Sequence, residues 1–258
     1  MIRRATMAGI SLIFLLLIMV PGANAKPQNS GAPKEEVEKP LLQTGTCGYC
    51  GSSGTLCNAW GEINASLQPI GIRSYIAVGD PTIRDGLWSF MRVGIAGYPT
   101  QGGWHVLESG WLKDPCFVTP GCSRYGSWKL ETRHVVIVQN YNGYSKMDVA
   151  NAPPGQTHEY RVEKDASGPG HLAYIDSNLV AGAWLDFVVP ALTIGGGEVQ
   201  NPPNNGLGPS TFSQVKYKNT SHQWVNVGTN YGMVITTPNT SYQATSYGSN
   251  SWFIGGCN

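Results

Sequence analysis

Short runs of β-branched and aromatic residues recur along most of the chain, separated by glycine, proline, asparagine and serine. Within these runs apolar residues alternate with polar or small ones, which is the period of a strand whose two sides face different surroundings. A helical period is almost absent. Strands are predicted at 70–78, 87–96, 103–113, 132–141, 157–163, 171–176, 181–189, 194–200, 211–218, 223–227 and 233–236. This spacing predicts an all-β fold, an antiparallel β-sandwich of two packed, curved sheets with a jelly-roll-like arrangement.

The first residues follow a different pattern. Arg3 and Arg4 precede an apolar run over 10–20, and the small residues 23–25 come soon after. A basic start, a short apolar stretch and a small-residue cleavage site predict a secretory signal peptide, which we place at 1–25. No later run approaches about 20 apolar residues, so we expect a secreted protein with no membrane-embedded part once the signal is removed.

Two further regions follow the signal. The stretch 26–46 is polar and rich in Pro, Lys and Glu, which predicts a flexible leader or a short pro-segment. The stretch 47–258 has the length of one β-sandwich domain. Removing Arg3 and Arg4 lowers the basic count from 17 to 15 against 16 acids, a formal charge of −1. The chain therefore lacks the basic field that would attract nucleic acid.

All the cysteines follow the leader, and their number, 6, is even. An even count in an exported chain predicts disulfides. We expect Cys116 to pair with Cys122 across a short loop. A second bond should join Cys257 to one of the cluster at 47, 50 and 57, with the partner left open. Cys47-Gly-Tyr-Cys50 could also be a redox or zinc pair, but there is no second such motif and no nearby histidine.

Two glutamates are the candidate chemistry. Glu108 and Glu198 each lie in a predicted strand, with Gly110 and Gly196 two residues away on the same side. These glycines predict open space beside each carboxylate. A carboxyl group among apolar neighbours is costly to ionise, and a second acid nearby separates the pair into a proton donor and a proton acceptor. Such a pair is typical of an acid-type hydrolase that activates and delivers water.

At these residues the chain resembles the neprosin family of glutamic peptidases. Glu108-Ser-Gly-Trp111 is similar to the family's Glu-x-Gly-Trp segment, and Gly196-Gly-Glu-Val199 is similar to its Gly-Gly-Glu-Val segment, in the same order. Leu207-Gly-Pro-Ser210 with the strand after it, and Thr119-Pro-Gly-Cys122, also fit the family. The resemblance covers about 70–224.

A weaker resemblance points to the eqolisins, fungal glutamic peptidases with a double-sheet β-sandwich. It rests on Pro154-Gly-Gln156 and on the region 184–198. Eqolisins pair a glutamine with a glutamate, so a glutamate at position 108 favours the resemblance to the neprosin family. The resemblances imply an endopeptidase of acidic optimum that tolerates or prefers proline at the cleavage site, without metal or cofactor. Its partner would be a polypeptide substrate, and we expect a monomer.

The roles of the two acids follow by analogy with the eqolisins. Glu198 would be the general base that activates water, and Glu108 the acid or oxyanion-stabilising partner. The exchanged roles stay open, because a coupled pair titrates as a unit. Trp128, Tyr141 and Tyr144 are candidates for lining a substrate groove, and Gln139 for donating a hydrogen bond to the site. Each aromatic residue could equally be an ordinary core or surface residue.

Other classes receive less support. A serine hydrolase is disfavoured because no G-x-S-x-G motif occurs, and a zinc peptidase because the histidines are scattered without H-E-x-x-H. The alternative from another class is a non-catalytic carbohydrate-binding or adhesive β-sandwich, which low charge and many Tyr and Trp residues also suit. A β-sandwich glycosidase would need two carboxylates as well. Other acids that could serve are Glu131, Glu159, Glu163, Asp176 and Asp186.

Overall fold

The computed structural model describes residues 56–83, 88–99, 103–115, 130–187, 190–200, 206–235 and 242–256. The predicted signal peptide, the leader and the cysteine pairs lie outside this part, apart from the backbone of Cys57. Within the described ranges no helix is long and apolar enough to cross a bilayer. The strands are β1 Leu56–Ile63, β2 Gly71–Ala77, β3 Ser89–Gly97, β4 His105–Pro115, β5 Leu130–Asn140, β6 Gly143–Asn151, β7 Thr157–Lys164, β8 His171–Ile175, β9 Asn178–Ala183, β10 Leu192–Gln200, β11 Leu207–Lys218, β12 Trp224–Asn226, β13 Tyr231–Ile235, β14 Tyr242–Ser246 and β15 Trp252–Gly256, with one 3-10 helix at Ala65–Leu67.

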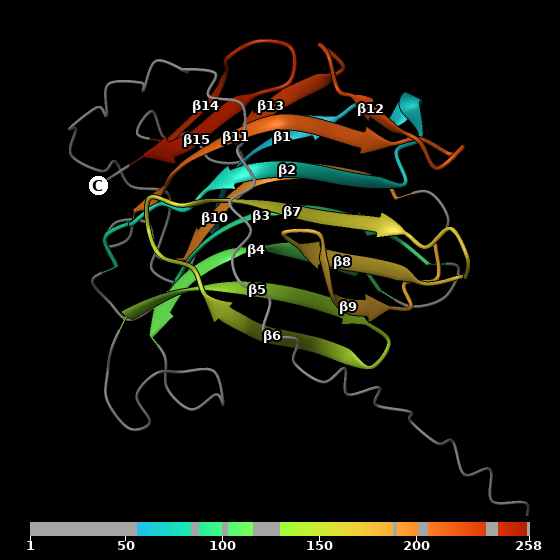
Figure 1. Cartoon of the computed structure of the whole chain (residues 1–258), viewed down its shortest axis with the longest axis horizontal. Helices are drawn as coiled ribbons and strands as arrows, with labels where there is room; N and C mark the ends of the chain where they lie inside the picture. The colour runs from blue at the N-terminus through green and yellow to red at the C-terminus, as the bar shows by residue number, and fades with distance from the viewer. Residues whose placement is uncertain are drawn as a thin grey trace, which may run out of the picture. The chain divides into compact units, whose positions relative to one another are not determined.

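The strands form two antiparallel sheets, which confirms the predicted all-β sandwich. One has seven strands in the order β13-β1-β10-β3-β4-β5-β6, and the other has eight, β14-β15-β11-β2-β7-β8-β9 with β12 beside β11. Figure 1 shows β2, β7 and β8 running alongside β3 and β4, and between the sheets β2 contacts β3, β7 contacts β3 and β4, and β8 contacts β4. Because consecutive strands often lie in different sheets, residues far apart in the sequence meet on one face.

Period-2 alternation builds the core between the sheets. In β3 the side chains of Met91, Val93 and Ile95 are buried there, and in β4 Leu107 and Trp111 join them. Facing residues such as Ile72, Ile76, Tyr160, Val162 and Phe212 come from the eight-stranded sheet. Fully burying one such side chain contributes about 1.5–3 kcal/mol. The core therefore fixes which residues of β3 and β4 face the other way.

Most predicted strands are present, with boundaries shifted by a few residues. The strand predicted at 181–189 lies earlier, at β9, and β1, β6, β14 and β15 were not predicted. β6 is an edge strand with mostly exposed side chains, so its sequence lacks the apolar alternation that marks a strand. β1 and β15 contain glycines that sequence patterns associate with turns.

Two buried histidines give the fold a pH dependence. His134 in β5 is 5% exposed and His171 in β8 is fully buried. Burial, together with the neighbouring His158, lowers the pKa of His134 to about 4. Burial, together with Lys164, lowers the pKa of His171 to about 4. Among the described residues, neither ring nitrogen of His171 has a hydrogen-bond partner.

We expect the free energy of unfolding to fall as the pH falls from about 6.5 to about 4, because the unfolded chain binds protons there that the folded chain excludes. Each histidine should contribute up to about 3 kcal/mol to this loss, at about 1.4 kcal/mol for each unit of pKa. His171→Phe removes one of the two groups. Urea unfolding near pH 7 and near pH 4.5 should therefore show a smaller loss of stability in this variant than in the wild type.

His222→Asn is the matched control, because His222 is exposed and has a left-handed backbone, with φ of 60°, which asparagine tolerates. The control should lose stability with acidification as the wild type does. An undiminished loss in His171→Phe would contradict the assignment of this pH dependence to the interior.

Candidate active site

Three adjacent strands bring Glu108, Arg92 and Glu198 together. β3 lies between β4 and β10, and Arg92 of β3 is opposite Gly110 of β4 and Gly196 of β10. Because Met91 and Val93 point into the core, Arg92 points to the other face of the sheet. We call this the outer face of the seven-stranded sheet. The two glutamates stand on the same face, one on each side of Arg92.

Both carboxylates bind the same guanidinium group. Arg92 Nε donates a hydrogen bond to Glu108 Oε1 at 2.5 Å, and Arg92 Nη2 donates one to Glu198 Oε2 at 2.8 Å. The side chain of Arg92 is 6% exposed, whereas those of Glu108 and Glu198 are 14% and 19% exposed. The acids thus keep part of their surface open while the cation between them is almost fully enclosed.

Burial and charge act in opposite directions on this group. Burial raises the pKa of Glu108, and this outweighs the lowering by Arg92; the charge of Glu198 raises it further. Burial disfavours the charged form of Arg92, but the two glutamates outweigh that effect and raise the pKa of Arg92. Glu108 therefore binds a proton at a higher pH than an ordinary glutamate does, and Arg92 remains charged.

The glycines around the acids allow neighbouring strands and side chains to pack more closely than the sequence pattern predicted. A Cβ at Gly94 would lie 3.1 Å from Glu108 Cγ, so this glycine makes room for the carboxylate. A Cβ at Gly110 would lie 1.9 Å from the carbonyl oxygen of Met91, and one at Gly196 would lie 2.2 Å from Cβ of Trp60. The prediction that Gly110 and Gly196 leave open space beside the acids was therefore wrong, because both glycines are needed for close contact between neighbouring strands.

The acids lie where two cavities meet on the outer face. One cavity has a volume of about 420 Å³ and the other of about 140 Å³, and both are lined by Arg92, Glu108 and Glu198. The larger one has an apolar floor, with buried Phe90, Leu112 and Ile137 against Trp88. The smaller one is lined by residues that include Asn58, Trp60, Ala96, Leu192 and Ile194. A ligand across both cavities would pass over the carboxylates.

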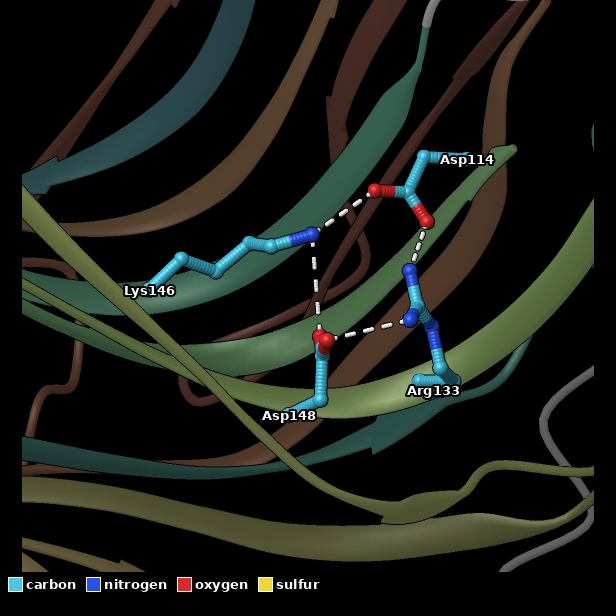
Figure 2. A network of polar contacts seen from close by, with 4 residues as sticks. All are labelled: Asp114, Arg133, Lys146 and Asp148. Atoms are coloured by element: carbon cyan, nitrogen blue, oxygen red, sulfur yellow. Dashed lines mark hydrogen bonds and ion pairs between the residues drawn. The ribbon is translucent and has the colours of Figure 1, made fainter. Parts of the chain in front are cut away.

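Asp114 and Lys146, which line the larger cavity, form a charge-balanced network with Arg133 and Asp148 (Figure 2). Nζ of Lys146 in β6 lies 2.8 Å from Oδ2 of Asp114 in β4 and 3.6 Å from Oδ1 of Asp148. Arg133 of β5, 2% exposed, pairs with the same two aspartates, at 3.0 Å for Asp148. Two cations and two anions alternate, so the network ties three strands together without adding net charge to the cavity wall.

The sequence candidates end up in different places. Gln139 and Tyr144 line the larger cavity together with both glutamates. Tyr141 lines neither cavity. Its hydroxyl donates a hydrogen bond to Asp186, and its ring packs edge-on against the ring of His105, with 4.3 Å between the ring centroids. Trp128 lies outside the described residues. The other acids considered include Glu159 and Glu163, which pair with Arg73 and Lys218 on the other sheet.

Arg92 was not foreseen, although the sequence contains a signal for it. In Phe90-Met-Arg-Val-Gly94 a single charge stands in a run that is apolar on both strand faces, and every residue of β3 is buried. A buried charge must be paired, so such an arginine predicts acids on the neighbouring strands. Among the described residues, no cluster of three or more His, Cys, Asp or Glu side chains is placed to hold a metal ion.

Comparison with known proteins supports the fold. No protein-family model and no curated protein matches the chain. Among solved structures, the chain is similar to scytalidoglutamic peptidase with a transition-state analogue inhibitor, at 11% identity over 80% of this chain and 99% of that one, with a TM-score of 0.52. It is also similar to SCP-B, a member of the eqolisin family in complex with the tripeptide Ala-Ile-His, at 10% identity over 79% and 98% of the two chains, with a TM-score of 0.45. At 11% identity the first likeness shows a common fold alone, and the neprosin resemblance stays a prediction.

We expect the Glu108 carboxyl group to titrate above the ordinary glutamate value of about 4.3, because burial disfavours its ionised form. ¹³C NMR of carboxyl-labelled glutamate over a pH series measures this directly. The resonance of Glu108 is identified by its loss in Glu108→Gln. A midpoint at or below the ordinary value would show that Arg92, and not burial, dominates this carboxyl.

Proposed function

We propose that the protein is a secreted glutamic endopeptidase that hydrolyses peptide bonds in acid. The observation that carries this proposal is the pairing of Glu108 and Glu198, from separate strands, on one guanidinium at the junction of two cavities. The fold shared with a glutamic peptidase supports it, and so does the sequence resemblance at the same two glutamates.

Glu198 acts as the general base in this proposal. Its carboxylate accepts a proton from a water molecule as the water oxygen attacks the carbonyl carbon of the scissile peptide bond. Glu108, in its protonated form, donates a hydrogen bond or a proton to the carbonyl oxygen, where negative charge develops. Collapse of the tetrahedral intermediate breaks the C–N bond, and the proton held by the acid pair passes to the leaving amine.

The electrostatics favour these roles over the reverse. Glu108 is the less exposed of the two acids, and burial raises its pKa, so it is the better candidate to hold the proton. The donor is present only below the pKa of Glu108, which lies above the ordinary value. Activity should therefore be lost as the pH rises through that pKa, and the enzyme should work in acid.

The groove suits an extended polypeptide. The two cavities lie on the two sides of the acid pair, so residues before and after the scissile bond would each have a place to bind. The apolar floor of the larger cavity would take apolar side chains, and Gln139 could donate a hydrogen bond to the substrate backbone. Acceptance of proline at the cleavage site, secretion after removal of 1–25 and activity as a monomer complete the proposal.

Mature protein should cleave an unfolded, proline-rich protein at about pH 3 to 5, the range of carboxylic acid pKa values. Glu108→Gln and Glu198→Gln should each lower kcat about 10²- to 10⁴-fold, because each removes a proton-transfer group. The double variant should be little worse than the weaker single variant, since the pair acts as a unit. Peptide mass spectrometry of the products measures the rates and the cleavage sites.

Glu163→Gln is the matched control: Glu163 is also buried and ion-paired, with Lys218 at 2.7 Å, but it stands on the eight-stranded sheet. It should retain the cleavage rate of the wild type. Equal activity in Glu108→Gln, Glu198→Gln and the wild type would reject the proposed site. If no protein is cut and a glycan array retains the chain, the carbohydrate-binding alternative is the better account.

A further inference from the structure

We infer that Arg92 is the positioning residue of this site, which holds Glu108 and Glu198 against one guanidinium and keeps one of the two acids charged in acid solution. This inference rests on the proposed function, and it assigns a role to a residue that the two-glutamate mechanism does not contain. Three features carry it: the geometry of the bridge, the placement of Arg92 outside the core, and the charges around it.

The geometry requires an arginine. Nε and Nη2 are neighbouring donors of one rigid planar group, and each binds a different carboxylate, at 2.5 Å and 2.8 Å. A lysine has a single ammonium on a flexible stem and could not present two donors in this fixed arrangement. One planar group therefore sets the relative position of two acids that come from strands on opposite sides of β3.

Arg92 is enclosed without belonging to the core between the sheets. Its neighbours Met91 and Val93 are in that core, whereas Arg92 lines both cavities on the outer face. Gly110 and Gly196, its partners in the two adjacent strands, carry no side chains that would compete for this space. Arg92 uses two of its donors on the two acids of the candidate site.

The charges explain why a cation is needed there. Two ionised glutamates at one site would repel each other, and both would then hold protons more tightly. With Arg92 between them, the group carries a net charge of −1 when both acids are ionised and is neutral once Glu108 is protonated. The cation thus allows Glu198 to stay ionised as the base while Glu108 holds the proton as the donor.

Few other side chains could influence the charges of Glu108 and Glu198. The remaining titratable side chains lining the two cavities are Asp114, Tyr144 and Lys146, all at the larger one. Asp114 and Lys146 are paired with each other at 2.8 Å in the charge-balanced network. Arg92 is therefore the cation in direct contact with both acids among the described residues.

Arg92→Gln and Arg92→Lys separate the charge from the geometry. Arg92→Gln removes the cation, which lowers the pKa of Glu108 in the wild type, so the alkaline limb of the pH profile of kcat should move to higher pH. Arg92→Lys keeps the charge, so its alkaline limb should stay near that of the wild type, while kcat falls at least about tenfold because the acids are no longer held by a planar fork.

Arg133→Gln is the matched control. Arg133 is also enclosed on the outer face and also bridges two carboxylates, Asp114 and Asp148, but it lines neither cavity. Its loss should lower the melting temperature and leave the alkaline limb of kcat in place. An alkaline limb that does not move in Arg92→Gln, or that moves equally in Arg133→Gln, would overturn the inference. If Arg92→Gln does not fold, an unchanged kcat in Arg92→Lys would overturn it.

A second readout does not depend on catalysis. In ¹³C NMR titrations of the glutamate carboxyls, Arg92→Gln should raise the midpoint of Glu108 above its midpoint in the wild type. If the wild type cleaves no protein, the proposed function fails, and this midpoint still decides whether Arg92 controls the pair. An unchanged midpoint in a folded Arg92→Gln variant would reject the role of Arg92 whether or not the protein is a peptidase.

Discussion

The ion pairs of Arg92 with Glu108 and Glu198 are the constraint on which the rest of the site depends. A guanidinium that is 6% exposed must be paired, because an unpaired buried charge is far too costly to keep. Satisfying it requires an acid on each neighbouring strand and close packing of β10, β3 and β4. Gly94, beside Glu108, and Gly110, beside the backbone of β3, allow that packing, and Gly196 allows β1 to approach β10 closely.

The outer face contains two arginines that each bridge two carboxylates. Arg92 bridges the two glutamates that line both cavities, and Arg133 bridges Asp148 and Asp114, of which Asp114 lines the larger cavity. The two bridges differ in balance: Lys146 neutralises the second, whereas the first keeps one negative charge in excess. This excess, close to open cavities, distinguishes the glutamate pair, to which we assign the proposed chemistry, from the charge-balanced network.

Acid acts on the protein in two opposite ways. Protonation of Glu108 produces the donor that the chemistry needs, whereas protonation of His134 and His171 opposes their burial between the sheets. Because the pKa of both histidines is about 4, the two rings stay neutral in the folded chain to well below the ordinary histidine range, and the fold loses stability progressively as the pH falls from about 6.5 to about 4. For the proposed peptidase, the pH range of activity would therefore be limited above by Glu108 and below by the interior of the sandwich.

The sequence predicted the fold well and the site in part. Alternation identified β2, β3, β4 and β7 and placed both glutamates in strands. It could not identify β6, because an exposed edge strand lacks alternation, and so Lys146 and the network went unseen. Arg92 was missed because its partners come from separate strands. The sequence of one segment does not show which strands pair with it, and so does not show which residues become its neighbours.

The most direct test of the central claim is a crystal structure of the mature protein with a peptide whose scissile bond is replaced by a tetrahedral, uncleavable group. The account predicts that the tetrahedral oxygens lie within hydrogen-bond distance of Glu108 and Glu198, with the peptide extending into both cavities. A peptide bound elsewhere on the sandwich, or one whose tetrahedral centre contacts neither glutamate, would contradict it.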